Sequence, residues 1–168
     1  MKLSEGVEWG LHAVLLLAGL PPGATLPARA LAECYALSET YLSKHLQALT
    51  NAGIIESVPG PRGGYRLTRA PREITLLEVV EAIEGREPAF RCTEIRQQGP
   101  LAMEPQAYRL PCAIHVAMAR AERAWREALR VQTLADILTA YTRSVAPEQQ
   151  RRGEQWVAEH MRLAPQKS

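Results

Sequence analysis

The sequence predicts a mainly α-helical protein that carries one small β-hairpin. Two observations support this class: apolar side chains recur at helical spacing along much of the 168-residue chain, and two short β-forming runs flank a turn rich in proline and glycine. The apolar share is 46% and the charged share 23%, as in ordinary globular domains, so the chain can bury a core. The longest uninterrupted apolar run, Ala13–Ala18, is far shorter than the roughly 20 residues that span a bilayer.

Three helices are expected before the hairpin. The first covers residues 3–20, where apolar side chains recur on one stripe and a Gly- and Pro-rich segment follows. The second is expected at 27–36, because proline is tolerated in a first helical turn. The third begins after Ser38, a good N-cap residue, and ends at 51–53. Its inner face is expected to carry Leu42, Leu46 and Leu49.

The hairpin is expected from the run at 54–58 and the run at 65–68, which the Pro- and Gly-rich residues 59–64 connect. Three helices followed by a hairpin is the order of a winged helix-turn-helix, a DNA-binding architecture in which the hairpin is the wing. We therefore expect a winged helix-turn-helix domain over residues 1–70.

The second half of the chain is expected to contain a connecting segment and a dimerisation helix. A helix at 75–84 and an aperiodic, Pro- and Gly-rich loop up to residue 111 form a connecting segment over 71–111. A long helix is expected at 112–143, because two apolar seams repeat every seven residues, a spacing that indicates a partner helix. A final helix and tail occupy 147–168. The seams carry Ile114, Ala121, Ala128 and Ala135, and beside them Ala117, Ala124, Val131 and Leu138.

Positive charge is concentrated in the third helix and the wing. Residues 40–70 contain four basic side chains and one acidic side chain, a net charge of +3, whereas the whole chain has +2 and the remainder therefore −1. Neutralising DNA phosphates requires such a concentration, although solvated surface charges would give the same count. The candidate DNA-binding residues are Thr40, Tyr41, Lys44, His45 and Gln47 on the third helix and Arg62, Gly63, Gly64 and Tyr65 in the wing. We expect Arg62 to enter a minor groove and the two glycines to supply positive φ values.

Several motifs together resemble one known family. They are the N-terminal MKLS, the segment LSETYLSKHLQAL at 37–49, the wing GPRGGYRL at 60–67, and ITLLEVV at 74–80 before a cysteine-bearing loop and a long helix. Over residues 1–142 the chain resembles the IscR/NsrR-type dimeric transcription regulators. The resemblance implies a homodimer held by the long helix, a near-palindromic operator in double-stranded DNA, and a 2Fe–2S cluster as the sensor.

The cysteines depart from the pattern of this family, which usually has three closely spaced cysteines in the loop. Here Cys92 and Cys112 are separated by nineteen residues that contain no cysteine. This widened pair is most similar to the redox-sensing branch typified by RsrR, in which residues of the first helix supplement two cysteines. The resemblance implies Glu8 and His12 as these further ligands, contributed by the other subunit.

The residue pattern is compatible with this ligand set and leaves alternatives open. Glu8 and His12 are four residues apart and share a helix face, but an exposed pair with no ligand role would look the same. Imidazole and thiolate ligate the 2Fe–2S cluster of Rieske proteins, whereas a carboxylate is a less usual iron ligand. Cys112 follows Pro111 at an expected helix start, where the helix dipole favours the thiolate. His115 is the alternative nitrogen ligand, one turn after Cys112.

Further expectations concern Cys34, other possible functions and the location of the protein. Cys34 is expected as a small core residue. Two other functions stay open: a cluster-free repressor with a small-molecule or partner-protein site under the loop, and a zinc enzyme that uses Cys92, Cys112 and His115. No carboxylate stands at a recognisable general-base spacing, so we expect no enzyme. No secretory leader opens the sequence, so we expect a cytoplasmic protein whose thiols stay reduced.

Overall fold

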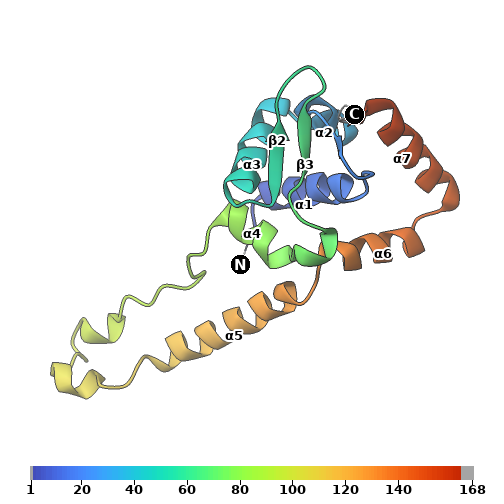
Figure 1. The fold of residues 1–168 in the computed structure, drawn as a ribbon. Coiled ribbons are helices and arrows are strands. Elements are labelled where there is room, and N and C mark those ends of the chain that lie inside the picture. Colours follow the sequence, from blue (N-terminus) through green and yellow to red (C-terminus); the bar gives the residue numbers. More distant parts are fainter. Residues whose placement is uncertain (1, 164–168) are drawn as a thin grey trace.

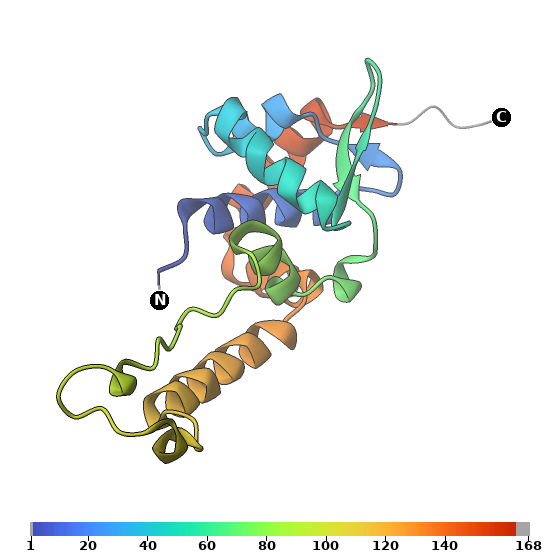
Figure 2. The same ribbon diagram turned by 90° about the vertical axis from the view of Figure 1, so that its left-hand side faces the viewer.

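The computed structural model describes residues 2–163, and it shows a helical body from which one helix and one loop project (Figures 1 and 2). The first part consists of α1 (Glu5–Ala18), β1 (Ala24–Thr25), α2 (Ala28–Cys34), α3 (Glu39–Asn51), β2 (Ile55–Val58) and β3 (Gly64–Leu67). The second part consists of α4 (Leu76–Glu84), α5 (Ala113–Arg130), α6 (Leu134–Ser144), α7 (Pro147–His160) and β4 (Arg162–Leu163). The predicted class, mainly helical with a small hairpin, is confirmed.

The core lies where the first three helices meet. Ser38 occupies the N-cap position of α3, as predicted, and Ser4 occupies that of α1, although neither side chain hydrogen-bonds to its helix end. The predicted inner face of α3 is buried and packs against apolar residues of α1, α2 and β2. The fully buried large side chains of the core include Val14, Leu26, Leu31, Leu42, Leu46, Leu49, Ile54 and Ile55.

Two glycines of α1 let this helix lie directly on its neighbours. A Cβ on Gly6 would lie 2.2 Å from Cε1 of His45 in α3, and a Cβ on Gly10 would lie 2.3 Å from Cδ1 of Ile83 in α4. Real Cβ atoms do not approach other atoms so closely, so a Cβ would displace the His45 ring at the first position and the terminal methyl of Ile83 at the second. As a result α1 is in close contact with α3 and α4 at the same time.

The hairpin forms as predicted and is tied to the body. Strands β2 and β3 are antiparallel, with Ile55 opposite Leu67 and Val58 opposite Gly64. The half-buried Tyr65 forms two backbone hydrogen bonds with the residue after β1: the amide of Leu26 donates to the Tyr65 carbonyl at 3.0 Å, and the Tyr65 amide donates back at 2.7 Å. The base of the wing is therefore fixed, and its turn extends from the body (Figure 1).

The predicted single helix at 112–143 is two helices, α5 and α6, with a break after Val131. Thr133 begins α6 with a capping box, in which its hydroxyl accepts from the Asp136 amide at 3.2 Å and the Asp136 carboxylate accepts from the Thr133 amide at 2.8 Å. The segment also pairs with the start of α4, because the Leu134 amide donates to the Ile74 carbonyl at 3.0 Å. The seven-residue pattern continues across the break, but Leu138 of α6 now faces the body instead of the α5 seam.

Helix α5 projects from the body together with the loop that precedes it (Figures 1 and 2). None of its 18 residues is buried, and it contacts the body mainly at α4. The Arg126 guanidinium forms an ion pair with Glu81 of α4 there, and Glu81 also contacts Arg86 at 3.0 Å. Within residues 2–163, no helix combines the length and apolar content that a membrane crossing requires.

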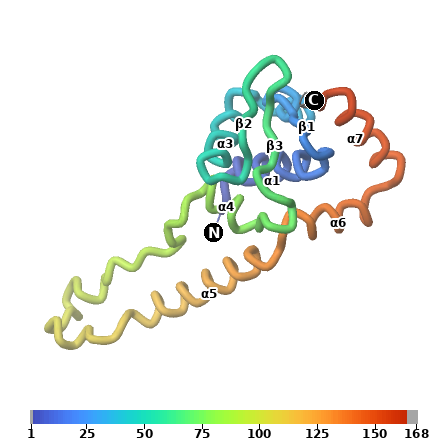
Figure 3. Tube along the Cα trace, in the orientation of Figure 1, coloured from blue at the N-terminus to red at the C-terminus, as the bar shows by residue number. Residues whose placement is uncertain are grey.

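The C-terminal segment returns to the wing. The predicted final helix, α7, ends at His160, and the chain continues as β4, which pairs with β1 (Figure 3). Ala24 lies opposite Leu163 and Thr25 opposite Arg162. This two-residue pairing was not predicted, since so short a strand has no periodic signal in the sequence.

Candidate DNA-binding face and metal centre

The outward face of α3 presents four of the five predicted DNA-binding side chains. Thr40, Tyr41, Lys44 and Gln47 are exposed, and Tyr41 keeps 66% of its surface accessible. The Gln47 amide donates to Oδ1 of Asn51 at 2.9 Å, which orients its side chain along the helix. Hydroxyl, amide and ammonium groups on one exposed helix face are suited to hydrogen bonds with base edges and phosphates.

His45 is the exception among the five, because its side chain turns toward α1. Its ring is half-buried and meets the Trp9 ring edge-on at 5.8 Å, directly above Gly6 of α1. Burial lowers the pKa of the His45 imidazole below its ordinary value, and the charge of Lys44 lowers it further. The physical reason is position on the helix, because His45 lies next to the buried leucine face and contacts α1.

The wing turn presents Arg62, whose side chain is exposed as predicted. The role expected of Gly63 is different, since positive φ values occur at Gly60 and Gly64 but not at Gly63. Gly63 is required for space: a Cβ there would lie 2.0 Å from the Val58 carbonyl oxygen. A Cβ on Gly64 would likewise lie 2.6 Å from the backbone that follows β1. The two glycines thus let the turn fold tightly and let its base lie against the body.

Part of the positive charge counted in the sequence is paired. The Arg66 guanidinium lies 2.6 Å from the Glu56 carboxylate within the hairpin, and Arg69 lies 2.9 Å from a carboxylate of α4. Lys44 and Arg62 form no ion pair within residues 2–163. Of the four basic side chains in residues 40–70, Lys44 and Arg62 therefore face solvent without an ion-pair partner in the described structure.

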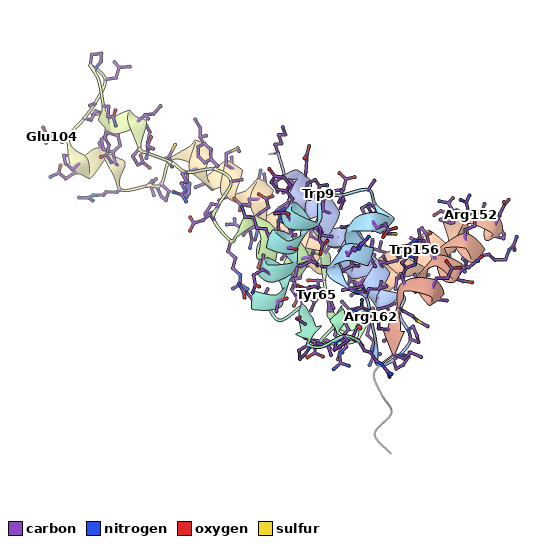
Figure 4. The ribbon with its side chains drawn as sticks, turned by 90° about the horizontal axis from the view of Figure 1, so that it is seen from above. Trp9, Tyr65, Glu104, Arg152, Trp156 and Arg162 are labelled. Atoms are coloured by element: carbon purple, nitrogen blue, oxygen red, sulfur yellow. The ribbon has the colours of Figure 1, made fainter. Side chains whose placement is uncertain are left out.

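Another arginine, Arg162, reaches the wing from the other end of the chain. Nη1 of Arg162 donates to the carbonyl oxygens of Pro61 at 2.9 Å and Gly63 at 3.0 Å, and the labelled Arg162 lies at the wing in Figure 4. The buried Thr25 hydroxyl donates to the Arg62 carbonyl at 3.5 Å. This contact was not predicted, because about 100 residues separate Arg162 from its partners in the sequence.

The two widely spaced cysteines come together at the N-terminal end of α5. Cys112 is the N-cap of α5 and is buried, and the side chain of Cys92 contacts it. The amides of the first turn, above all that of His115, hold the pKa of the Cys112 thiol below its ordinary value, and the Arg96 charge adds to this. The Cys92 thiol donates to Oε1 of Glu94 at 3.7 Å. The predicted tendency of Cys112 toward thiolate is therefore present.

The loop around this pair is held by side chains that were not among the predicted site residues. The Arg96 guanidinium donates to the Glu94 carboxylate at 2.7 Å and holds the pKa of that carboxyl below its usual range. The Tyr108 hydroxyl donates to the Arg96 carbonyl at 2.7 Å and accepts from the Met103 amide at 2.8 Å. Figure 4 shows how far the loop extends from the body, with Glu104 near its end.

The other predicted ligands do not meet the cysteines within one chain. Glu8 and His12 are exposed on α1, and the His12 ring lies 5.0 Å from the Tyr35 ring. The two views in Figures 1 and 2 place α1 well away from the cysteine end of α5. The ring of His115, the alternative ligand, lies 6.5 Å from that of Phe90. Among residues 2–163, no three His, Cys, Asp or Glu side chains converge as a metal site would require.

Cys34 lies at the edge of the core instead of inside it, which corrects the prediction. It is half-buried at the end of α2, and this burial raises the pKa of its thiol. A raised pKa keeps Cys34 a neutral thiol, so it is distinct from Cys112.

Two cavities bear on the small-molecule alternative. A polar cavity of about 260 Å³ lies between α4, the start of the loop and α5, where a site under the loop was expected. A more apolar cavity of about 360 Å³ lies between α1, α6 and α7. Its walls include Leu15, Leu16, Leu138, Tyr141, Val157 and Met161.

Comparison with known proteins gives a consistent result. The family model Rrf2, described as iron-dependent transcriptional regulator, matches residues 3–140. The transcriptional regulator NsrR of Geobacillus kaustophilus is 32% identical over 82% of this chain and 90% of its own length, and NsrR of Shouchella clausii is 30% identical over 82% and 89%.

Solved structures agree with this match. CymR, the global cysteine regulator of B. subtilis, superposes with a TM-score of 0.67 at 26% identity and covers 83% of this chain and 98% of its own. IscR of T. potens gives a TM-score of 0.66 over 90% of this chain and 96% of its own, and at 24% identity it supports the fold.

Proposed function

This chain belongs to the Rrf2 family of transcriptional regulators, and from that premise we propose that it is a homodimer whose operator affinity is set by a 2Fe–2S cluster. Its relatives are DNA-binding transcription regulators and not enzymes, so the zinc-enzyme alternative is set aside. The observation that carries the proposal is the meeting of Cys92 and Cys112 at the exposed end of α5.

The homodimer is supported by the surface of α5. Its apolar side chains are exposed, with 65% of Ile114, 50% of Val116 and 43% of Met118 accessible. The small residues of the seven-residue pattern, which would allow a second helix to approach closely, are also exposed: Ala117, Ala121, Ala124 and Ala128. An exposed apolar seam of this length is costly in water, and a second copy of α5 would cover it.

The dimer would present two α3 helices and two wings to DNA. A two-fold protein recognises two half-sites about one helical turn apart, which explains the expectation of a near-palindromic operator. In each half, Lys44 and Arg62 supply the unpaired positive charge, and Thr40, Tyr41 and Gln47 supply the groups for base edges and phosphates.

The residues present fit half of a cluster ligand set. Cys92 and Cys112 supply two neighbouring sulfurs, one of them with a lowered pKa, and Glu8 and His12 of the partner subunit would complete the set. When bound, a 2Fe–2S cluster supplies a one-electron change of charge. Because Glu8 and His12 belong to α1, and α1 lies directly on α3 through Gly6, these residues would link the loop of one protomer to the reading helix of the other.

The size of the expected effect follows from allosteric coupling. Coupling of about 1–3 kcal/mol between sensor and operator would change DNA affinity about 5- to 150-fold. A shift of α1 would change the spacing of the two α3 helices, and half-site recognition depends on that spacing.

The experiment begins with anaerobic purification, with iron and sulfide quantified per chain and an operator duplex selected from a random library by the wild-type protein. We expect a coloured dimer whose affinity for this duplex differs between the oxidised and reduced forms at one salt concentration. Alanine variants of Cys92, Cys112, Glu8 and His12 should each lose the cluster or change its spectrum. The matched control is His115→Ala, which should retain it.

Two results would contradict the proposal. Equal DNA affinity in both redox states would contradict the sensing role. Loss of the cluster in His115→Ala but not in His12→Ala would show that His115, and not His12, is the nitrogen ligand.

The cluster-free alternative keeps the fold and the DNA site. It is favoured by the apolar cavity of about 360 Å³ between α1, α6 and α7, a size that suits a compact apolar small molecule. Protein that is colourless after anaerobic purification, yet binds the selected duplex, would support this alternative.

A further inference from the structure

The C-terminal segment of the chain lies outside the matched family region and contacts the wing. The family model ends at residue 140, whereas α7 and β4 follow it and lead the chain back to the hairpin (Figure 3). The wing is thus in contact with a part of the chain that family membership does not account for.

This segment is anchored before it reaches the wing. Trp156 and Met161 pack against the hydrophobic core, and the His160 ring stacks on the Trp156 ring with centroids 4.1 Å apart. Nδ1 of His160 lies 2.7 Å from the Trp156 carbonyl oxygen. Arg162 follows Met161, and the pairing of β4 with β1 then sets its direction.

Arg162 contacts the backbone on both sides of the wing-tip residue. One nitrogen, Nη1, donates to the carbonyls of Pro61 and Gly63, the two neighbours of Arg62. The carbonyl of Arg62 itself lies near the Thr25 hydroxyl of β1. Three successive carbonyl groups of the turn are therefore held from the side of β1 and β4, while the Arg62 side chain is exposed to solvent.

A turn with this sequence needs external support. Residues 59–64 contain two prolines and three glycines, so the turn has few side chains of its own that could pack. Ordering such a turn at the moment of DNA binding costs conformational entropy, and a turn that is ordered beforehand avoids this cost. A guanidinium is suited to this task because its planar donors hold a fixed geometry.

We propose that Arg162 is a positioning residue that orders the wing and thereby aims Arg62 at DNA. The inference rests on the proposed DNA-binding role of the wing and concerns neither the cluster nor its ligands. Arg162 acts through Arg62 and makes no DNA contact of its own.

The test has one arm without DNA and one arm with it. In the free protein, hydrogen exchange of the Gly63 amide, which donates to the Gly60 carbonyl at 2.8 Å, reports the order of the turn. We expect Arg162→Ala to raise this exchange rate about 5-fold or more, and Arg162→Lys, which retains the charge, to raise it as well. The matched control Arg152→Ala removes the same charge from the exposed face of α7 and should leave the rate unchanged.

In the second arm, affinity for the selected duplex is measured for the single variants Arg62→Ala and Arg162→Ala and for the double variant. If Arg162 acts through Arg62, the double variant binds no more weakly than Arg62→Ala alone. If Arg162 instead contacted DNA independently, the losses of affinity would be additive. The slope of log affinity against log salt concentration would also fall by about one unit for Arg162→Ala.

Additive losses, or unchanged Gly63 exchange in both Arg162 variants, would overturn the inference. Failure of the DNA-binding role of the wing has a different signature, since the wild-type protein would then select no duplex while the exchange result would still stand. Absence of the cluster would leave both arms of the test unaffected.

Discussion

Replacing Gly63 by alanine tests whether the tight wing turn is needed for DNA binding. A Cβ at this position would lie 2.0 Å from the Val58 carbonyl oxygen and 2.8 Å from the Pro59 carbonyl carbon. Both neighbours are backbone atoms, so relief requires the turn itself to move by about 1 Å or more, at a cost of roughly 1–3 kcal/mol. Because the turn extends from the body, we expect it to open while the core stays intact.

An open turn would lose the hydrogen bond from the Gly63 amide to Gly60 and the contacts of Arg162. We expect affinity for the selected duplex to fall about 10- to 100-fold, the equivalent of about 1.4–2.8 kcal/mol. The melting temperature should fall by only a few degrees, since no core side chain changes. Fluorescence anisotropy at one fixed salt concentration and thermal unfolding measure the two quantities.

Pro61→Ala is the control, because it alters the same exposed turn without introducing a collision. Its affinity should stay within about 3-fold of the wild type, and its loss should be smaller than that of the glycine variant. Wild-type affinity in Gly63→Ala would refute the reasoning, and so would a loss of affinity fully explained by global unfolding.

Three further predictions concern the rest of the molecule. Glu81→Gln weakens a nearly buried ion pair with Arg126, so the free energy of unfolding should fall by about 1–3 kcal/mol in urea titrations, and an unchanged value would contradict the role of this pair in docking α5. Ala124→Glu places like charges in the proposed seam, so sedimentation should show at least a 100-fold weaker dimer, whereas a dimer of wild-type strength would place the interface elsewhere. Burial would raise the pKa of Glu78, but hydrogen bonds from Thr75 and a neighbouring arginine outweigh it and hold that pKa below 4.5. Because the pKa of Glu78 is lower in the folded than in the unfolded state, the stabilisation is present above about pH 4.5 and is lost as the pH falls through the folded-state pKa. Glu78→Gln should therefore reduce the fall in the free energy of unfolding over this acidic range. An equal fall in both proteins would contradict the prediction.

The sequence alone was sufficient for the order and type of most elements. The buried face of α3, the hairpin, helix α4 and the aperiodic loop all follow from patterns within about fifteen residues, and such patterns act through local backbone geometry. The break before α6 had a local signal as well, because Thr133 and Asp136 form a capping box, but the seven-residue repeat on both sides obscured it.

The site depended more on contacts between distant residues. Periodicity placed His45 on α3, but the glycine of α1 that it covers decided that its ring turns inward. Counting charges could not show that Arg66 and Arg69 are paired. Spacing alone could not bring Cys92 to Cys112, since the loop between them folds around its own Arg96 and Tyr108.

The sequence by itself therefore determined a winged helix-turn-helix with a basic wing, because helices, hairpins and caps are encoded by neighbouring residues. Only the tertiary structure decided which cations remain unpaired, that α1 and the cysteine pair lie apart within one chain, and that Arg162 reaches the wing. These features depend on how segments up to about 100 residues apart in the sequence pack against one another, which no local pattern records.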